Sequence, residues 1–280
     1  MKKRISIIAI AIVTIVTFGV VCLSSCEKEN NRNNNNYSNS EKSVANPYNY
    51  VGTIHNDVVL EVGQSLKDTL DFYAQKSVMS DADYARLMNH VTAEMLDVFD
   101  KEYPDYMQVV DDLGGINAIA STDEVDEDDP LYVMIADLLD DSYTTEELIS
   151  NVDAMVATVM NQQGVDTSIT SQKLMVLSVM KNSLILWKDA FENENNPWHN
   201  YVLAEYNRSN DSKGLFKKLI NKIKKALRDD GATIAIVDAA GAVDGVYFFV
   251  KSGCPVGFWG CLGCVITGAA FHSLSAAILS

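Results

Sequence analysis

The chain has 280 residues, of which 48% are hydrophobic, and a formal net charge of −16 at pH 7. It is long enough to bury a sizeable core, and its acidic balance repels the phosphates of nucleic acid, so we expect no nucleic-acid partner. The charge is uneven, because residues 41–212 hold 32 acidic and 9 basic side chains, whereas residues 213–228 hold seven basic and no acidic ones.

The first 25 residues have the organisation of an export signal. Basic residues occupy positions 2–4, an apolar run extends from Ile5 to Val21, and small residues precede Cys26. This order is typical of a cleaved signal peptide rather than of a spanning helix. An ordinary secretory signal and a short uncleaved anchor are the alternatives.

The segment Leu23-Ser24-Ser25-Cys26 resembles the lipobox of bacterial lipoproteins. In that family, signal peptidase II cleaves before the cysteine, and the thiol carries a diacylglycerol. The resemblance therefore implies a signal peptide over residues 1–25 and lipidation at Cys26, with acyl chains such as palmitate. Because two or more acyl chains give stable anchoring, it also implies that the protein is attached to a membrane through lipid, in the cell envelope at the outer membrane.

Residues 26–45 are predicted to form a disordered, Asn-rich tether. Six asparagines within residues 30–36 are interrupted by a single arginine, and the surrounding residues supply no apolar face. The acidic start of the tether, at positions 27–29, resembles the signals that send Bacteroidota lipoproteins to the cell surface. That resemblance implies surface exposure of the domain that follows.

Residues 46–210 are predicted to form an acidic helical bundle. Apolar residues recur at three- and four-residue intervals, and no alternating strand pattern flanked by hairpin turns is present. Short breaks between the periodic segments favour antiparallel neighbours, so the predicted fold class is all-α, an irregular helical bundle. Helices are expected over residues 55–77, 80–98, 131–139, 144–160, 171–187 and 198–206, with a further short one between positions 104 and 114.

Three local signals mark helix starts in this bundle. Ser80 with Asp83 is typical of a helix start. Thr144 with Glu147 has the spacing of a capping box. Pro130 follows a run of acidic residues and suits the first turn of a helix.

Six carboxylates lie within residues 123–129. Such a cluster can bind calcium, but the spacing of an EF-hand fails because no glycine occupies the sixth position of the loop. We favour a solvated acidic loop and predict no metal site.

Residues 213–228 are predicted to form a basic amphipathic helix. Aliphatic side chains share one face and lysines occupy the other, as in cationic antimicrobial peptides and in helices that lie at membrane interfaces. The alternative, which we favour, is a surface helix whose basic face pairs with the acidic bundle. The candidate membrane-contacting residues are Lys217, Lys218, Lys222, Lys224 and Lys225.

Residues 231–280 are predicted to form an apolar, Gly/Ala-rich helical hairpin. Its helices are expected at 231–251 and 257–279, with a turn at 252–255, and similar hairpins occur in exported proteins of Bacteroidota. The uncharged stretch is long enough to span a bilayer. However, its glycines dilute the hydrophobicity, and Asp238 and Asp244 are costly in hydrocarbon unless they are paired or protonated. The hairpin is therefore either buried against the bundle or inserted into a membrane on demand.

Three further cysteines lie in this apolar region, at Cys254, Cys261 and Cys264. A disulfide or redox pair would leave one thiol over. A zinc site with His272 is a further alternative, although the spacings suit known zinc fingers poorly. Buried thiols are the interpretation that the apolar setting favours.

Motifs for common catalytic sites are absent from the sequence. There is no HExxH, GxSxG, phosphate loop or dinucleotide fingerprint, and the four histidines, at positions 55, 90, 199 and 272, are scattered. We therefore expect no enzyme activity and no cofactor. The leading hypothesis is a lipid-anchored envelope lipoprotein, of interaction or structural type, that presents an acidic helical surface to an envelope protein. The alternative is a membrane-active protein, toxin-like or bacteriocin-like, that inserts residues 215–280 into bilayers.

Overall fold

The computed structural model describes residues 45–104, 130–138, 144–162, 167–211 and 257–279, together with eight residues between positions 234 and 246. Within these ranges the chain is helical with short turns and has no strand, which confirms the predicted all-α fold. The predicted signal peptide, nearly all of the tether, the short helix after residue 104 and the basic helix at 213–228 lie outside the described residues. The helices are α2 (Asn49–Ser65), α3 (Lys67–Ala74), α4 (Asp81–Glu102), α6 (Pro130–Leu138), α7 (Thr145–Asn161), α8 (Thr167–Glu192), α9 (His199–Asp211) and α12 (Gly257–Leu279).

The predicted helix starts are confirmed. The Ser80 hydroxyl accepts from the Asp83 backbone N–H at 3.2 Å, and the Asp83 carboxylate accepts from the Ser80 N–H at 3.1 Å. Thr144 and Glu147 form the same reciprocal pair at the start of α7. Each pair satisfies backbone donors that the first helical turn leaves free. Pro130 is the first residue of α6, as its position in the sequence predicts.

Several predicted boundaries are wrong, since α4 continues to Glu102 instead of ending at 98 and α9 continues to Asp211 instead of ending at 206. The helix expected over residues 55–77 is two helices, because the backbone departs from helical geometry at Leu66, and the first of them already starts at Asn49. Helix α8 starts at Thr167 rather than at Ser171. The Ser171 hydroxyl donates to the Thr167 carbonyl at 2.8 Å, so this serine lies inside the helix instead of capping it.

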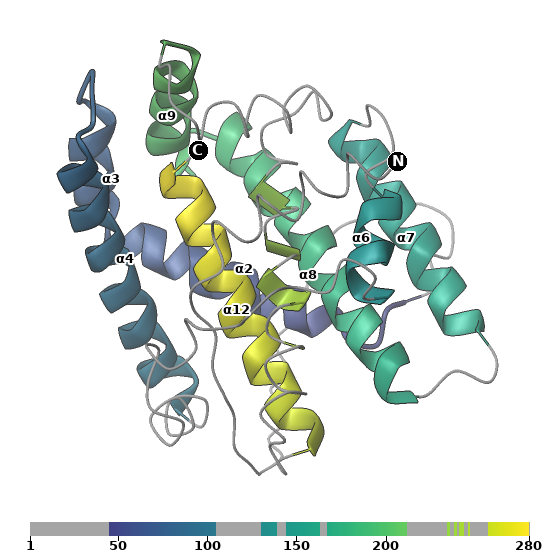
Figure 1. The fold of residues 1–280 in the computed structure, drawn as a ribbon. Coiled ribbons are helices and arrows are strands. Elements are labelled where there is room, and N and C mark those ends of the chain that lie inside the picture. The colour runs from purple at the N-terminus through teal and green to yellow at the C-terminus, as the bar shows by residue number, and fades with distance from the viewer. Residues whose placement is uncertain are drawn as a thin grey trace.

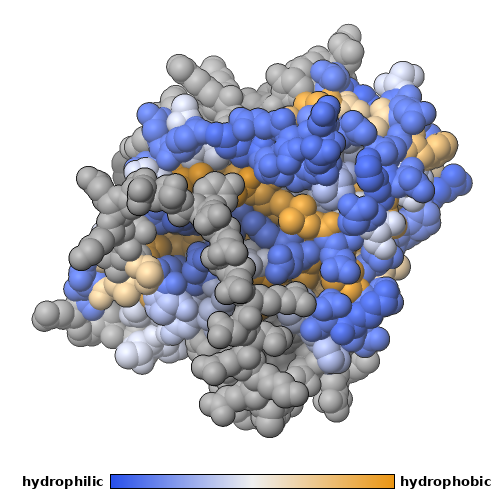
Figure 2. All heavy atoms as spheres, turned by 180° about the vertical axis from the view of Figure 1, so that it is seen from behind, coloured by the Kyte–Doolittle hydropathy of each residue, from blue (hydrophilic) through white to orange (hydrophobic). Residues whose placement is uncertain are grey.

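Helix α8 lies at the centre of the bundle. Every residue from Leu174 to Met180 is buried, so this part of the helix is covered on all sides and not only along one apolar stripe. Helix α2 crosses α8 and passes behind α12, α7 lies along α8, and α3, α4 and α9 form the opposite flank (Figure 1). On the face opposite to that of Figure 1, a band of apolar side chains shows between hydrophilic margins (Figure 2).

Helix α12 is part of this core. Its described side chains from Cys264 to Ala270 are all buried, and the helix packs against α2, α4, α8 and α9. The Tyr201 hydroxyl of α9 donates to the Ile278 carbonyl at 3.1 Å near the end of α12. The sequence leaves two placements open for this segment, and in the structure α12 is buried against the bundle. In the described ranges, no helix combines the length and the apolar content needed to cross a bilayer.

Helices α2 and α8 approach each other closely at Gly52. A Cβ atom at this position would lie 2.3 Å from the Ser178 carbonyl oxygen and 2.5 Å from Nδ2 of Asn182. The missing side chain lets the Gly52 N–H donate to the Ser178 hydroxyl at 3.0 Å, and that hydroxyl donates to the Asn49 carbonyl at 3.1 Å. Position 52 therefore has no room for a side chain, so the close packing of the two helices requires glycine.

We expect Gly52→Ala to lower the free energy of unfolding by about 1–3 kcal/mol, because the added methyl group must push α2 away from α8. Thermal or urea unfolding measures this loss. The matched control is Thr53→Ala on the next, half-buried position, where the hydroxyl bonds only to the backbone of its own helix. We expect a change within about 0.5 kcal/mol there. Equal losses in the two variants would contradict the packing argument.

Candidate functional site

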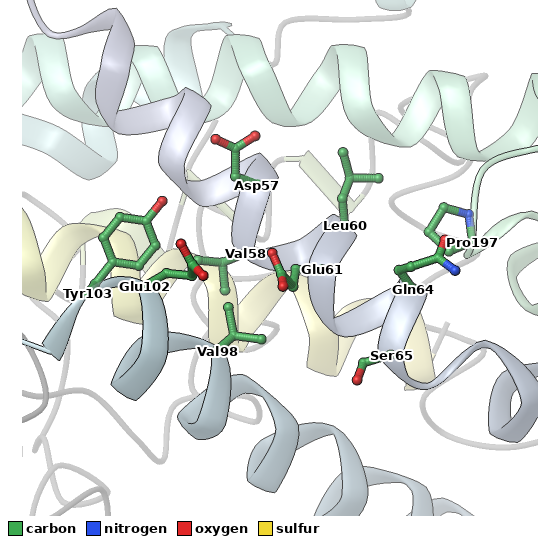
Figure 3. A pocket seen from close by; sticks show the side chains of 10 residues that line it. All are labelled: Asp57, Val58, Leu60, Glu61, Gln64, Ser65, Val98, Glu102, Tyr103 and Pro197. Carbon is green, nitrogen blue, oxygen red and sulfur yellow. The ribbon is translucent and has the colours of Figure 1, made fainter. Parts of the chain in front are cut away.

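An open groove of about 700 Å³ lies where α2 passes α4. Figure 3 shows Glu61 and Glu102 close to Val58, with Asp57 on the side of α2 away from α4. The groove thus combines an apolar floor with carboxylates from both helices. Its lining consists of Asp57, Val58, Leu60, Glu61, Gln64, Ser65, Val98, Glu102, Tyr103 and Pro197.

The charge around the groove is negative. No lysine or arginine is among its described lining residues, and Glu94 accepts from the Ser65 hydroxyl at its edge at 2.5 Å. Lys101, in the last turn of α4, pairs with Asp97. That pairing, together with the charges of Glu94 and Glu61, raises the pKa of Lys101 above its ordinary value. A cation therefore finds an excess of carboxylates here.

A second cluster of polar side chains is buried at the centre of the molecule, around Asp238. Oδ2 of Asp238 accepts from the Ser183 hydroxyl, from Nε1 of Trp187 at 3.0 Å and from the Ser273 hydroxyl at 2.8 Å. Nε2 of His55 lies 3.7 Å from the same oxygen. All of these polar groups are fully buried, and they come from α2, α8, α12 and the segment 234–246.

Burial sets the titration of this cluster. Loss of water raises the pKa of Asp238 from 3.8 to about 7, although the three donors oppose the shift. Loss of water also lowers the pKa of His55 from 6.5 to about 4, against hydrogen bonding to Asn56 and to the backbone of Ala269. Burial therefore disfavours the charged form of each group, as expected for ionisable side chains in an apolar interior.

Serine, histidine and aspartate are the residue types of a hydrolytic triad, but their arrangement here differs. The Ser183 hydroxyl donates to the carboxylate of Asp238 and not to His55, so the histidine does not activate it. None of the three side chains reaches the surface. The cluster therefore holds helices together and offers no nucleophile to a substrate.

A third polar group, Glu205 of α9, is 2% exposed and pairs with Arg208 one turn later. Nε of Arg208 donates to Glu205 at 3.1 Å, and the Tyr84 hydroxyl of α4 donates to the other carboxylate oxygen at 3.1 Å. The same guanidinium donates to the carbonyls of Tyr73 and Lys76, at 3.1 and 2.6 Å. Burial and the charge of Glu205 raise the pKa of Tyr84 to about 12. This ion pair thus ties α9 to the end of α3 and to α4.

Most of the predicted site residues lie outside the described residues. These include Cys26, Cys254, the acidic cluster at 123–129 and the lysines Lys217, Lys218, Lys222, Lys224 and Lys225. Cys261 lies in α12, and the structure does not describe its side chain. Cys264 is buried in the same helix. Because the other two side chains are not described, the pairing of these cysteines stays a prediction. Among the described side chains, no group of three or more His, Cys, Asp or Glu is placed to hold a metal ion.

The sequence contained a signal for the buried cluster but not for the groove. Asp238 stood out as a carboxylate in an apolar segment that must be paired or protonated. His55 occupies the same helical face as Val58, Val59 and Val62, a pattern from which its burial could have been predicted. The groove depends on how α2 passes α4, which no local pattern predicts.

No protein-family model matches this chain, and neither does any curated protein or any solved structure.

The ion pair of α9 leads to a prediction. Arg208→Met leaves Glu205 buried without its cation, so we expect a loss of about 3–5 kcal/mol in the free energy of unfolding. Adding Glu205→Gln to that variant removes the uncompensated charge and should recover part of the loss. Lys67→Met, at the more exposed Lys67–Asp71 pair, is the control and should cost less than about 1 kcal/mol. A double variant as unstable as Arg208→Met would argue against an electrostatic cause.

Proposed function

We propose that this protein is a lipid-anchored lipoprotein of the cell envelope, held at the outer membrane through Cys26, and that its helical bundle binds a cationic partner protein in the groove between α2 and α4. Its role is an interaction role without catalysis. The single observation that carries the binding proposal is this groove, where the carboxylates of Glu61 and Glu102 lie beside an apolar floor. An amphipathic helix with lysines beside its apolar face matches both features.

The placement of α12 supports this proposal over the membrane-active alternative. Insertion of residues 215–280 into a bilayer would withdraw the described α12 side chains from the core, where they contact α2, α4 and α8. It would also expose the partners of Asp238 on α8. Those contacts favour a bundle that keeps its shape while it binds.

The groove can be tested with a defined probe, a fluorescent amphipathic peptide of lysine and leucine, and the full chain in nanodiscs of zwitterionic lipid. We expect Glu61→Gln/Glu102→Gln to weaken peptide binding about tenfold, a change of about 1.4 kcal/mol, and to reduce its dependence on salt. Fluorescence anisotropy measures both.

The control removes the same number of charges elsewhere, with Asp68→Asn/Asp81→Asn on exposed positions of α3 and α4 that do not line the groove. It should bind the peptide like the unaltered protein. Equal weakening in the two double variants would mean diffuse attraction by an acidic surface, and would sink the proposed site. Binding of a free peptide with the sequence of residues 213–228, at equal or higher affinity, would instead identify a segment of this chain as the occupant.

The lipid anchor has a separate test. Mass spectrometry of the protein purified from membranes should find an N-terminal peptide that begins with acylated Cys26, and Cys26→Ser should release the protein from the membrane fraction. A wild-type chain with an unmodified cysteine would contradict the anchor, whatever the groove binds.

A further inference from the structure

The polar cluster around Asp238 contains two buried atoms without a hydrogen-bond partner. They are Nε2 of His55 and Oδ1 of Asp238, and no other buried side-chain nitrogen or oxygen in the described residues lacks one. The two side chains face each other, with Nε2 of His55 3.7 Å from Oδ2 of Asp238. Since buried polar groups are rarely left unpaired, the two orphaned atoms need a common explanation.

The protonation of His55 follows from its neighbours. Asn56 donates its side-chain N–H to the Asn182 carbonyl at 2.9 Å, which leaves its oxygen to face Nδ1 of His55 at 3.0 Å. An oxygen can only accept, so Nδ1 carries the hydrogen. In the neutral imidazole, Nε2 then carries a lone pair 3.7 Å from Oδ2 of Asp238, while the backbone of Ala269 favours the protonated ring. A carboxylate beside a lone pair is repulsive unless one of the two groups is protonated.

We infer that His55 and Asp238 together hold a single proton in the folded protein, so that α2 and the C-terminal apolar segment that carries Asp238 meet in a buried pair without net charge. It resides either on Asp238, whose Oδ1 has no hydrogen-bond partner, or on Nε2, as an imidazolium beside the carboxylate. In both forms the pair is neutral as a whole, so its burial avoids a net charge in the core.

The surroundings of Asp238 support the shared proton. Among the described residues, His55 carries the only basic side-chain nitrogen within 4 Å of an Asp238 carboxylate oxygen, and the donors to Oδ2 are two hydroxyls and an indole of α8 and α12. Lys181 and Lys188 of α8 are paired elsewhere, with Asp153 and Glu146. No cation of these helices therefore compensates Asp238 directly. The shifted pKa values agree, since Asp238 at about 7 and His55 at about 4 leave one proton on the pair between these limits.

The shared proton has a signature in the pH dependence of stability. The pKa of Asp238 is raised, so on its own this residue stabilises the fold fully below about pH 4, and that stabilisation is lost as the pH rises to about 7. The pKa of His55 is lowered, so on its own this residue destabilises the fold progressively as the pH falls from 6.5 to about 4. Over this shared window the unfolded chain also holds one proton, on the histidine, so the two effects cancel in the intact pair.

The test is urea unfolding of the full chain between pH 4.5 and 6.5. At each pH, the unfolding equilibrium constant of each protein is divided by that of the double variant His55→Gln/Asp238→Asn. In His55→Gln the ratio should rise with pH, by up to about tenfold per pH unit, and in Asp238→Asn it should fall by a similar factor. In the wild type it should stay nearly flat. His199→Gln and Asp68→Asn, outside the cluster, should both follow the wild type.

A wild type that follows either single variant would overturn the inference, because it would mean that the pair does not hold one proton together. A ratio that does not change with pH in either single variant would overturn the inference as well. Should Asp238→Asn fail to fold, infrared and NMR spectra of the wild type at pH 6 decide. They must show either a protonated buried carboxylic acid or a charged His55 ring, and the absence of both would contradict a shared proton.

Discussion

A carboxyl group can be buried among apolar helices only where several donors are brought to it, and in this protein that constraint acts at Asp238. The donors come from α8 and α12, and the facing imidazole comes from α2. These residues lie up to 218 positions apart in the chain, between His55 and Ser273. Because each donor must reach the same oxygen, the cluster sets how α2, α8 and α12 are placed relative to one another. The surrounding apolar contacts supply most of the stability, and the polar cluster limits the arrangements in which they can form.

Helix α2 links this core to the surface. Its inner face carries His55, and its Gly52 lets it approach α8 closely. Glu61 and Gln64 on its outer side line the acidic groove with residues of α4. The groove thus rests on a helix that is fixed at its back by close packing and by a buried polar cluster. Such a support suits a binding surface, because a rigid groove loses less conformational entropy when a partner helix docks.

Features that depend on neighbouring residues could be predicted from the sequence, and features that depend on tertiary contacts could not. The two capping boxes and the first-turn proline of α6 are local, so their residues alone were sufficient. The early start of α8 was missed because its first turn is exposed and has little apolar periodicity, and the break at Leu66 was missed because no glycine or proline stands at it.

The apolar C-terminal segment shows the same division. Its helical character and the cost of Asp238 could be derived from composition, but its placement could not, because lipid and a protein core both accept a helix that is apolar all round. No short stretch of the sequence could identify the donors on α8 and α12 that bond to Asp238. The groove could not be predicted either, because its lining residues come from α2, α4 and Pro197, which lie up to about 140 positions apart in the chain.

Hydrogen exchange of the full, membrane-anchored chain tests most directly whether α12 belongs to the core. If Asp238 and its donors bind the helices into one unit, the buried amides of α2, α8 and α12 should exchange only through a common opening, with equal free energies and equal response to denaturant. Fast exchange in α12, while α2 and α8 stay protected, would contradict this. It would show that the C-terminal helix leaves the bundle independently and that the polar cluster does not hold it.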